Sequence, residues 1–292
     1  MLKLGVAGRR GAAVSVGGAA DVVIARALAA VAMRSGAARM DVIQTVCYEN
    51  LAGQDIQGPA LDDLGLEATE GCDPGHLLRH CRVVPNPLQE PRSRGKGKRI
   101  SAALDWPHGE RLLGAALSRG FANLFGAEGR CNYDFVIGVD GGGDVLGLDE
   151  QTDMRVLAVL RRACAHDVRL AMVVAGLGAD GATLPEQIRQ ATLSGWDKHG
   201  EERMDLAFAA LLEEGLRQAS CWLDNPLAWG PENPAWNYDL KVPQIISMAI
   251  RGQFPFACPE KGLVCFPRRG ALRVMCPQLL ATARFYLPGV PG

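Results

Sequence analysis

The sequence lacks any apolar run of the roughly 18 to 20 residues that a membrane-spanning helix requires. It also lacks an excess of charge of either sign, because 31 lysines and arginines are matched by 32 aspartates and glutamates. This balance argues against a nucleic acid or an anionic membrane as the partner. The nine cysteines are odd in number and scattered, which argues against a disulfide framework. We therefore expect a cytoplasmic protein that acts on a small molecule.

Several nucleotide-binding and catalytic motifs are missing as well. No glycine-rich turn continues into the Gly-Lys-Ser/Thr of a Walker loop, and none completes Gly-x-Gly-x-x-Gly. A standard nicotinamide or flavin site is therefore not predicted. The absence of a Gly-x-Ser-x-Gly elbow argues against an α/β-hydrolase.

Strand-like and helix-like patterns alternate along much of the chain, which is typical of a mostly parallel sheet covered by helices. We expect the fold class α/β: one domain over residues 1–292, with a doubly wound, Rossmann-like but non-standard sheet. A hairpin over residues 262–277, turning at 268–270, should precede a short terminal helix. The pattern predicts strands at 12–16, 40–49, 133–140 and 168–176, a long loop within 51–100, and helices at 22–36, 109–125, 153–167, 184–194 and 201–219.

The alternation stops in a segment rich in tryptophan and proline. Trp222, Trp229 and Trp236 lie within it, among four prolines. Such composition is more typical of a lid or an interface than of a core. We interpret residues 223–241 as an insertion within the domain, and we expect a homo-oligomer.

Three of the predicted strands end in glycine turns that carry aspartates. The first turn is "VGGAAD" with Asp21, the second is "VDGGGD" with Asp140 and Asp144, and the third is "GLGADG" with Asp180. In parallel sheets, ligands bind beyond the carboxyl ends of the strands. Glycine lets backbone amides approach a ligand there. The same aspartates and glycines could instead only cap helices and form tight turns.

Converging carboxylates repel a phosphate, which would otherwise suit glycine turns. A divalent cation between carboxylates and phosphate removes the conflict, and so does a ligand with a positive amine. We predict Mg²⁺ or Mn²⁺ bound by Asp140 and Asp144. Asp149, Glu150 and Asp153 follow the second turn, where the helix macrodipole is enough to explain them.

Other polar clusters have simpler explanations. Cys72, His76, His80 and Cys81 could supply at most three zinc ligands from one helix, and a packed amphipathic helix is the better interpretation. The basic run at 91–99 is short and without aromatic residues, so a solvated loop or a mobile lid is expected there. Beside a predicted helix start, His108 is the histidine to test as an acid or base, although a structural role is the better-supported one.

Together these turns and flanking motifs resemble a bacterial and archaeal family, domain of unknown function family 1152. The resemblance covers residues 13–285. Two features depart from the family pattern: Ala19 and Ala20 replace glycines, and residues 223–241 are added. The resemblance implies this fold and this set of turns, and no particular reaction. It rests on "GGAADVVIARAL", "VCYENLAG", "LDWPHGERLLGAAL", "GVDGGGDVLGLDE", "GLGADGATLPEQI" and "AIRGQF".

The sequence thus predicts an enzyme that acts on a small phosphorylated or nucleotide substrate with a divalent metal. The alternatives are a metal-free lyase or transferase for a cationic amino compound, and a non-catalytic binding or interaction subunit. The predicted catalytic residues are Asp144, Asp140 and His108, and the predicted binding residues are Gly17, Gly18, Asp21, Gly141, Gly142, Gly143, Glu150, Gly178, Asp180 and Gly181.

Overall fold

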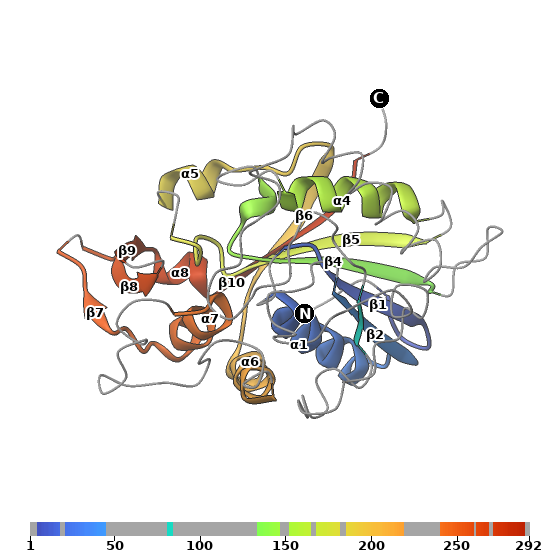
Figure 1. Ribbon diagram of the computed structural model, residues 1–292, viewed down its shortest axis with the longest axis horizontal. Coiled ribbons are helices and arrows are strands. Elements are labelled where there is room, and N and C mark those ends of the chain that lie inside the picture. Colours follow the sequence, from blue (N-terminus) through green and yellow to red (C-terminus); the bar gives the residue numbers. More distant parts are fainter. Residues whose placement is uncertain are drawn as a thin grey trace, which may run out of the picture.

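The structure is a computed structural model, and it describes residues 5–17, 21–44, 81–83, 133–146, 152–164, 168–181, 185–218, 240–259, 261–268 and 271–289. Two sheets and their helices make up this part of the chain (Figure 1). Within it, no helix is long and apolar enough to cross a membrane. The elements are β1 (Arg10–Ser15), α1 (Asp21–Arg34), β2 (Arg39–Gln44), β3 (Cys81–Val83), β4 (Phe135–Gly141), η3 (Asp144–Leu146), α4 (Thr152–Ala163), β5 (Arg169–Ala175), α5 (Pro185–Gln190), β6 (Trp196–Arg203), α6 (Leu206–Gln218), α7 (Val242–Arg251), β7 (Phe256–Ala257), β8 (Val264–Arg268), β9 (Ala271–Met275), α8 (Pro277–Leu280) and β10 (Thr282–Pro288).

The larger sheet has the order β3-β2-β1-β4-β5-β10-β6. Strands β3, β2, β1, β4 and β5 pair in parallel, and β10 is antiparallel to both β5 and β6. The chain moves outward in one direction from β1 and in the other direction from β4. This reversal is the topological switch point of a doubly wound sheet, so the predicted α/β class is confirmed.

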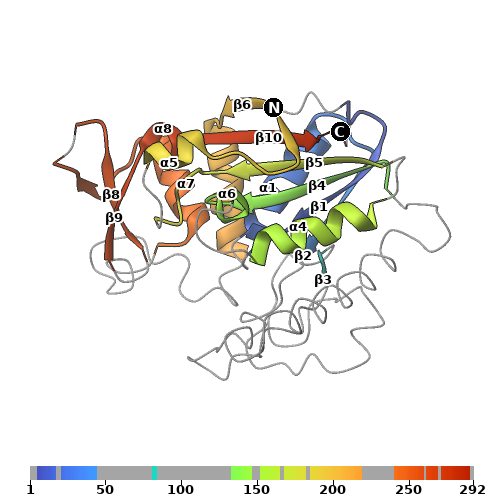
Figure 2. The same ribbon diagram turned by 90° about the horizontal axis from the view of Figure 1, so that it is seen from above.

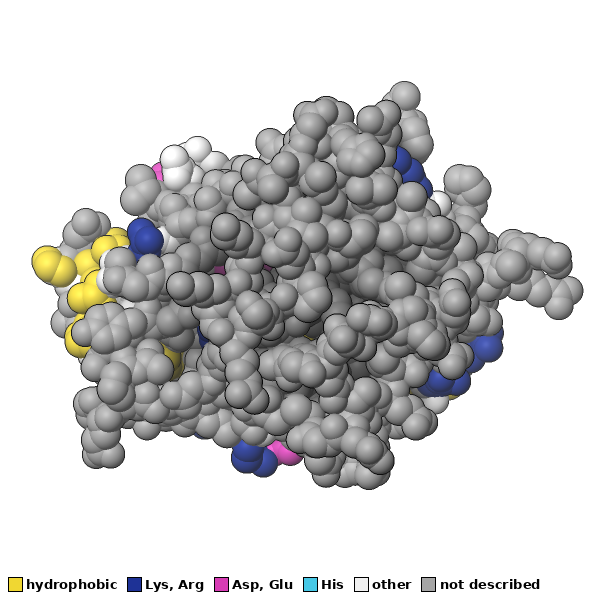
Figure 3. Space-filling view, in the orientation of Figure 1, with side chains coloured by type: hydrophobic (Ala, Val, Ile, Leu, Met, Phe, Trp, Pro, Cys, Tyr) yellow, Lys and Arg dark blue, Asp and Glu magenta, His cyan; other side chains and the backbone are white. Residues whose placement is uncertain are grey.

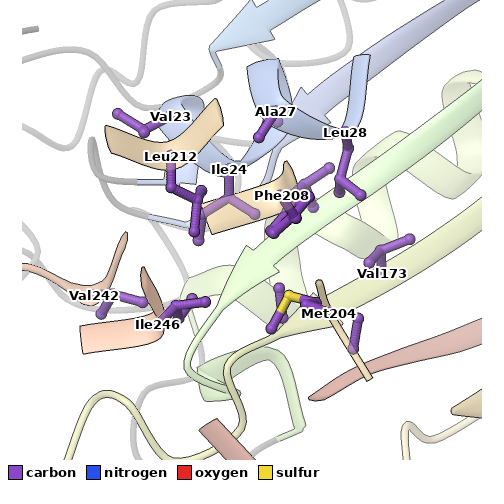
Figure 4. Packing of buried hydrophobic residues seen from close by; sticks show 14 of the residues in the cluster. Val23, Ile24, Ala27, Leu28, Val173, Met204, Phe208, Leu212, Val242 and Ile246 are labelled. Atoms are coloured by element: carbon purple, nitrogen blue, oxygen red, sulfur yellow. The ribbon is translucent and has the colours of Figure 1, made fainter. Parts of the chain in front are cut away.

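Helices cover both faces of this sheet. Figure 1 shows α4 on one side and α1, α6 and α7 on the other. A hydrophobic core lies on each face of the sheet, and side chains of β1 point to the two faces alternately. Ala13 lies in the first core, on the side of α1 and α6, and Ala12 and Val14 lie in the second core, on the opposite face. In the first core Phe208 and Leu212 of α6 pack against Ile24 and Leu28 of α1, and Figure 4 shows this packing. Since α1 and α4 lie on opposite faces, their N-termini approach the switch point from both sides.

The second sheet is the predicted hairpin with one extra strand. β8 and β9 pair in antiparallel fashion with Arg268 opposite Ala271, and β7 joins β8. In Figure 3, hydrophobic side chains gather at the end of the molecule where Figure 1 labels these strands. Leu272 and Val274 on β9 are exposed there.

Some predicted elements need correction. The helix predicted at 201–219 begins only at Leu206, because residues 196–203 form β6. The predicted terminal helix, α8, is followed by the unpredicted strand β10, which lies between β5 and β6 (Figure 2). Helix α7 was not predicted, although Pro243 is its second residue and Gly252, with φ 68°, caps its end. The loop predicted within 51–100 contains the short strand β3. The predicted helix 109–125 and nearly all of the segment 223–241 lie outside the described residues.

Candidate functional site

The carboxyl ends of β1 and β4 lie side by side at the switch point. Their parallel pairing runs to Ser15 opposite Val139, and the Val16 amide donates to the Val139 carbonyl at 2.9 Å. Beyond these ends the chain turns into α1 and η3. Residues at the end of β4 and in the first turns of α1 and α4 are therefore close enough for their side chains to meet.

Three aspartates meet at this point. Asp21 is the first residue of α1, Asp140 is the last residue but one of β4, and Asp153 is the second residue of α4. Each offers a carboxylate oxygen, and these three oxygens all lie within 4.8 Å of one another. We call this group the carboxylate cluster. Its members come from three separate segments, so only the folded sheet brings them together.

The carboxylate cluster is buried and incompletely hydrogen-bonded. Asp21 is 3 % exposed, Asp140 is 0 % exposed and Asp153 is 8 % exposed. Asp140 Oδ2 accepts a hydrogen bond from the Val145 amide at 3.3 Å, whereas Asp140 Oδ1 and Asp21 Oδ2 are buried without a hydrogen-bond partner. A buried polar atom that lacks a partner costs free energy. A cation between these oxygens would remove that cost.

The pKa of Asp21 and that of Asp140 are both raised well above the ordinary value. Burial is the largest cause for both residues. The charges of neighbouring aspartates add to it: Asp153 and Asp144 act on both, and Asp140 and Asp180 also act on Asp21. For Asp140, hydrogen bonds from the Val145 and Gly143 amides oppose the shift. This mutual repulsion is what a divalent cation would reverse.

Gly17 makes the close approach of two of these carboxylates possible. A Cβ atom at Gly17 would collide with Oδ2 of Asp21 and with Oδ2 of Asp153. The sequence predicted that this glycine would admit a ligand to the backbone. Its observed effect is to leave room for the carboxylates of the cluster.

The second glycine turn has a different role from the predicted one. The Gly142 amide donates to the Ala175 carbonyl at 2.9 Å, and the Gly143 amide is hydrogen-bonded to Asp140. Both amides are therefore engaged within the protein and do not form a free cradle for a phosphate. Gly142 has φ 107°, and a Cβ atom there would collide with the carboxylate of Asp180.

The remaining predicted residues have diverse positions. Asp144 begins η3 and is partly exposed; it is outside the group of three whose oxygens lie within 4.8 Å, although its charge acts on Asp21 and Asp140. Asp180 is buried against Gly142. The Gly178 amide donates to the Gly142 carbonyl at 2.6 Å, which links the second and third turns.

Gly141 lies within β4, where Ile24, Asp21 and Val242 surround it. The predictions for Gly18, His108, Glu150 and the segments with Cys72, His76, His80 and the basic run 91–99 fall outside the described residues.

Asp153 is the residue that the sequence did not assign to the site. Its place near a helix start was explained by the macrodipole, and that explanation needs no ligand. The predicted doubly wound sheet could have identified Asp153, because the helix after β4 starts beside the switch point of such a sheet. An aspartate in the first turn of that helix is then a candidate ligand for the same reason as Asp21.

These features define an α/β protein with a candidate cation site at the switch point of its sheet. The chain matches no model of a known protein family, and no curated protein matches it either.

Proposed function

We propose that the protein is an enzyme that acts on a small phosphorylated or nucleotide substrate with the help of Mg²⁺ or Mn²⁺. The cation would bind Asp21, Asp140 and Asp153, and it would draw the phosphoryl oxygens to the switch point. Membership of the family 1152, a cytoplasmic location and a homo-oligomeric assembly remain predictions from the sequence, and none of them names the reaction.

One observation carries the proposal: three buried carboxylates meet within 4.8 Å, and two of their oxygens are without a hydrogen-bond partner. Carboxylate oxygens are the ligands that Mg²⁺ prefers, and Mg²⁺ commonly bridges one or two carboxylates to substrate phosphates. A bound cation of this kind polarises a phosphoryl oxygen and stabilises the negative charge that develops on it. The position beyond the strand ends is where α/β sheets bind their ligands.

A thermal-shift titration of the metal-free protein with Mn²⁺, with and without ADP, tests the proposal. At about one hundred times its dissociation constant, Mn²⁺ should add roughly 2.7 kcal/mol to the free energy of unfolding. For a chain of 292 residues this corresponds to an increase in Tm of roughly 4 to 5 °C. Asp153→Asn should abolish the shift, whereas Asp144→Asn should leave most of it. A shift that is abolished by Asp144→Asn and kept by Asp153→Asn would instead favour Asp140 and Asp144, the metal ligands predicted from the sequence.

Two glycine variants provide a matched comparison in the same titration. Gly17→Ala places a methyl group against Asp21 and Asp153, and we expect Mn²⁺ affinity to fall at least tenfold. Gly200→Ala adds the same methyl group in β6, where nothing lies within 4 Å of the new atom, and Mn²⁺ affinity should not change. The metal proposal is wrong if neither Mn²⁺ nor Mg²⁺ shifts the wild-type protein.

A metal-free lyase or transferase for a cationic amino compound is the second candidate. The engaged amides of Gly142 and Gly143 favour it, because an ammonium group needs only carboxylate acceptors and no amide donors. The two candidates differ in their response to a chelator. An amine that binds equally well in EDTA would support the second candidate and oppose the first.

A further inference from the structure

Arg273 lies on the inward face of the hairpin, against the third glycine turn. Side chains alternate along β9, so Arg273 shares a face with the buried Met275, and the exposed Leu272 and Val274 occupy the other face. The residue opposite Arg273 on β8 is Phe266, which is buried in the core. An arginine at such a position points toward the body of the molecule.

The stem of Arg273 rests on the third glycine turn. A Cβ atom at Gly181 would lie 2.7 Å from Cγ and 2.8 Å from Cβ of Arg273, so the absence of a side chain at Gly181 makes room for the arginine. Gly181 directly follows Asp180, whose carboxylate lies against Gly142. The turn at residues 176–181 therefore carries Asp180, whose charge acts on Asp21, next to the glycine that contacts Arg273.

The guanidinium of Arg273 is not satisfied by the described part of the protein. Its Nε atom is buried without a hydrogen-bond partner, and the side chain makes no ion pair or hydrogen bond with another described residue. Arg268 on the neighbouring strand also has a buried Nε without a partner, but its Nη1 donates to the Leu240 carbonyl at 3.2 Å. Arginine stays charged at any pH of interest, and a buried donor without an acceptor is unfavourable. An anionic ligand would supply the acceptor.

We infer that Arg273 binds the phosphoryl group of the substrate beside the third glycine turn. The inference rests on the proposed function and extends it by naming the group that recognises the anion. A guanidinium presents a planar fork of donors that fits two oxygens of one phosphate. The amides of Gly142 and Gly143 are engaged, so these two turn amides do not provide this recognition.

Isothermal titration of the Mn²⁺-loaded protein with pyrophosphate, ADP and adenosine tests the inference. Pyrophosphate and ADP should bind to the wild-type protein, and adenosine, which has no phosphate, should bind at least tenfold more weakly than ADP. Arg273→Met should weaken pyrophosphate and ADP at least tenfold and leave the dissociation constant of Mn²⁺ within twofold. Arg273→Lys should restore part of the affinity, because it keeps the charge and loses the fork.

Thermal unfolding separates this role from a structural one. Arg273→Met removes an unsatisfied buried donor, so its Tm should equal or exceed that of the wild-type protein. Arg268→Met removes the same charge from the neighbouring strand together with a hydrogen bond, so it should lower Tm and leave pyrophosphate affinity within twofold.

The possible failures point to different parts of the argument. Unchanged pyrophosphate affinity in Arg273→Met overturns the role of the arginine and leaves the proposed function standing. A lowered Tm with a parallel loss of Mn²⁺ binding in that variant also overturns it, as a structural role would give this result. A wild-type protein that binds Mn²⁺ but neither pyrophosphate nor ADP overturns the inference and the phosphorylated substrate together, and one that binds no Mn²⁺ overturns the metal.

Discussion

Two buried aspartates of the same sheet have opposite surroundings. Asp41 on β2 accepts hydrogen bonds from the Tyr133 hydroxyl at 2.7 Å and from Arg39 Nε at 2.9 Å. Asp140 on β4 has one oxygen without a partner, and its charged neighbours are other carboxylates. The burial of the two side chains is similar, at 4 % and 0 % exposed. The difference therefore lies in what each carboxylate contacts.

Opposite stability changes should follow when each aspartate becomes asparagine. In EDTA at pH 7, Asp140→Asn should raise the free energy of unfolding by roughly 1 to 2 kcal/mol, because it removes a repelled and unsatisfied buried carboxylate. Asp41→Asn should lower it by roughly 1 to 3 kcal/mol, because it breaks a satisfied buried pair. Urea denaturation of the metal-free proteins measures both. Loss of stability in both variants would mean that Asp140 has a partner in solution.

The pH dependence of the Asp140→Asn variant follows from the raised pKa of Asp140. Above the ordinary value of 3.8 and below the raised pKa, the folded protein keeps a proton that the unfolded chain has released. The free energy of unfolding of the wild-type protein therefore falls as the pH rises through this window. The stability advantage of Asp140→Asn should be small near pH 4 and should grow toward neutral pH. An advantage that shrinks with rising pH would contradict the shift.

At the residue scale, two of the three aspartates that the structure brings together had been selected from the sequence. Asp21 and Asp140 were predicted because each follows an apolar strand and a glycine turn marks the strand end. Asp153 was not predicted, because its contact with Asp21 and Asp140 depends on which face of the sheet α4 covers. Gly17 was predicted to bind a ligand through its backbone, whereas the groups that approach it in the structure are carboxylates of the same chain.

At the scale of elements, the buried parallel strands were predictable and the strands on the β6 side were not. β4 and β5 are almost wholly buried, so their sequences are continuously apolar. β6 has the sequence "WDKHGEER" and is mostly exposed, so no apolar alternation distinguishes it from a charged helix start. β10 depends on pairing with two strands that are distant in the sequence, and no local pattern encodes such pairing.

Arg284 links β10 to β6 and α5 through side-chain hydrogen bonds. The side chain is 3 % exposed and donates from Nε to Glu201 at 2.8 Å and from Nη1 to the Ile188 carbonyl at 2.9 Å. Arg284→Met should lower the free energy of unfolding by about 2 to 4 kcal/mol, because the buried Ile188 carbonyl and the half-buried Glu201 carboxylate both lose a donor. Guanidinium denaturation measures the change.

Lys198→Met is the matched control for Arg284→Met. Lys198 contacts the same Glu201 at 2.7 Å, but its side chain is about half exposed. Removing it should cost less than about 1 kcal/mol, as is typical of surface ion pairs. Equal costs for the two variants would show that Glu201, rather than the carbonyl contacts of Arg284, determines the stability of this region.

At the scale of the whole molecule, the carboxylate cluster joins the two helical layers. Asp21 comes from α1 on one face of the sheet, Asp153 comes from α4 on the other face, and Asp140 comes from the sheet between them (Figure 1). A cation bound to all three would connect both layers, so its effect should not be confined to one helix.

Hydrogen exchange with and without saturating Mn²⁺ tests this connection. Amide exchange should slow in the first turns of α1 and α4 together, and the β8–β9 hairpin should keep its rate because it contributes no carboxylate to the cluster. Slowing in α1 alone would mean that Asp153 does not bind the cation. Asp153→Asn should remove the effect from both helices.

The position of β10 also constrains how the protein is made. During synthesis β5 and β6 emerge from the ribosome long before β10, yet neither can pair with the other in the native sheet, because β10 separates them. Both strands therefore keep an open edge until β10 has been translated, and open edges invite pairing with other chains. The charged residues of β6 suit this interval, because charged side chains on an exposed edge discourage such pairing. A nascent chain halted before residue 282 should consequently need a chaperone to stay out of aggregates.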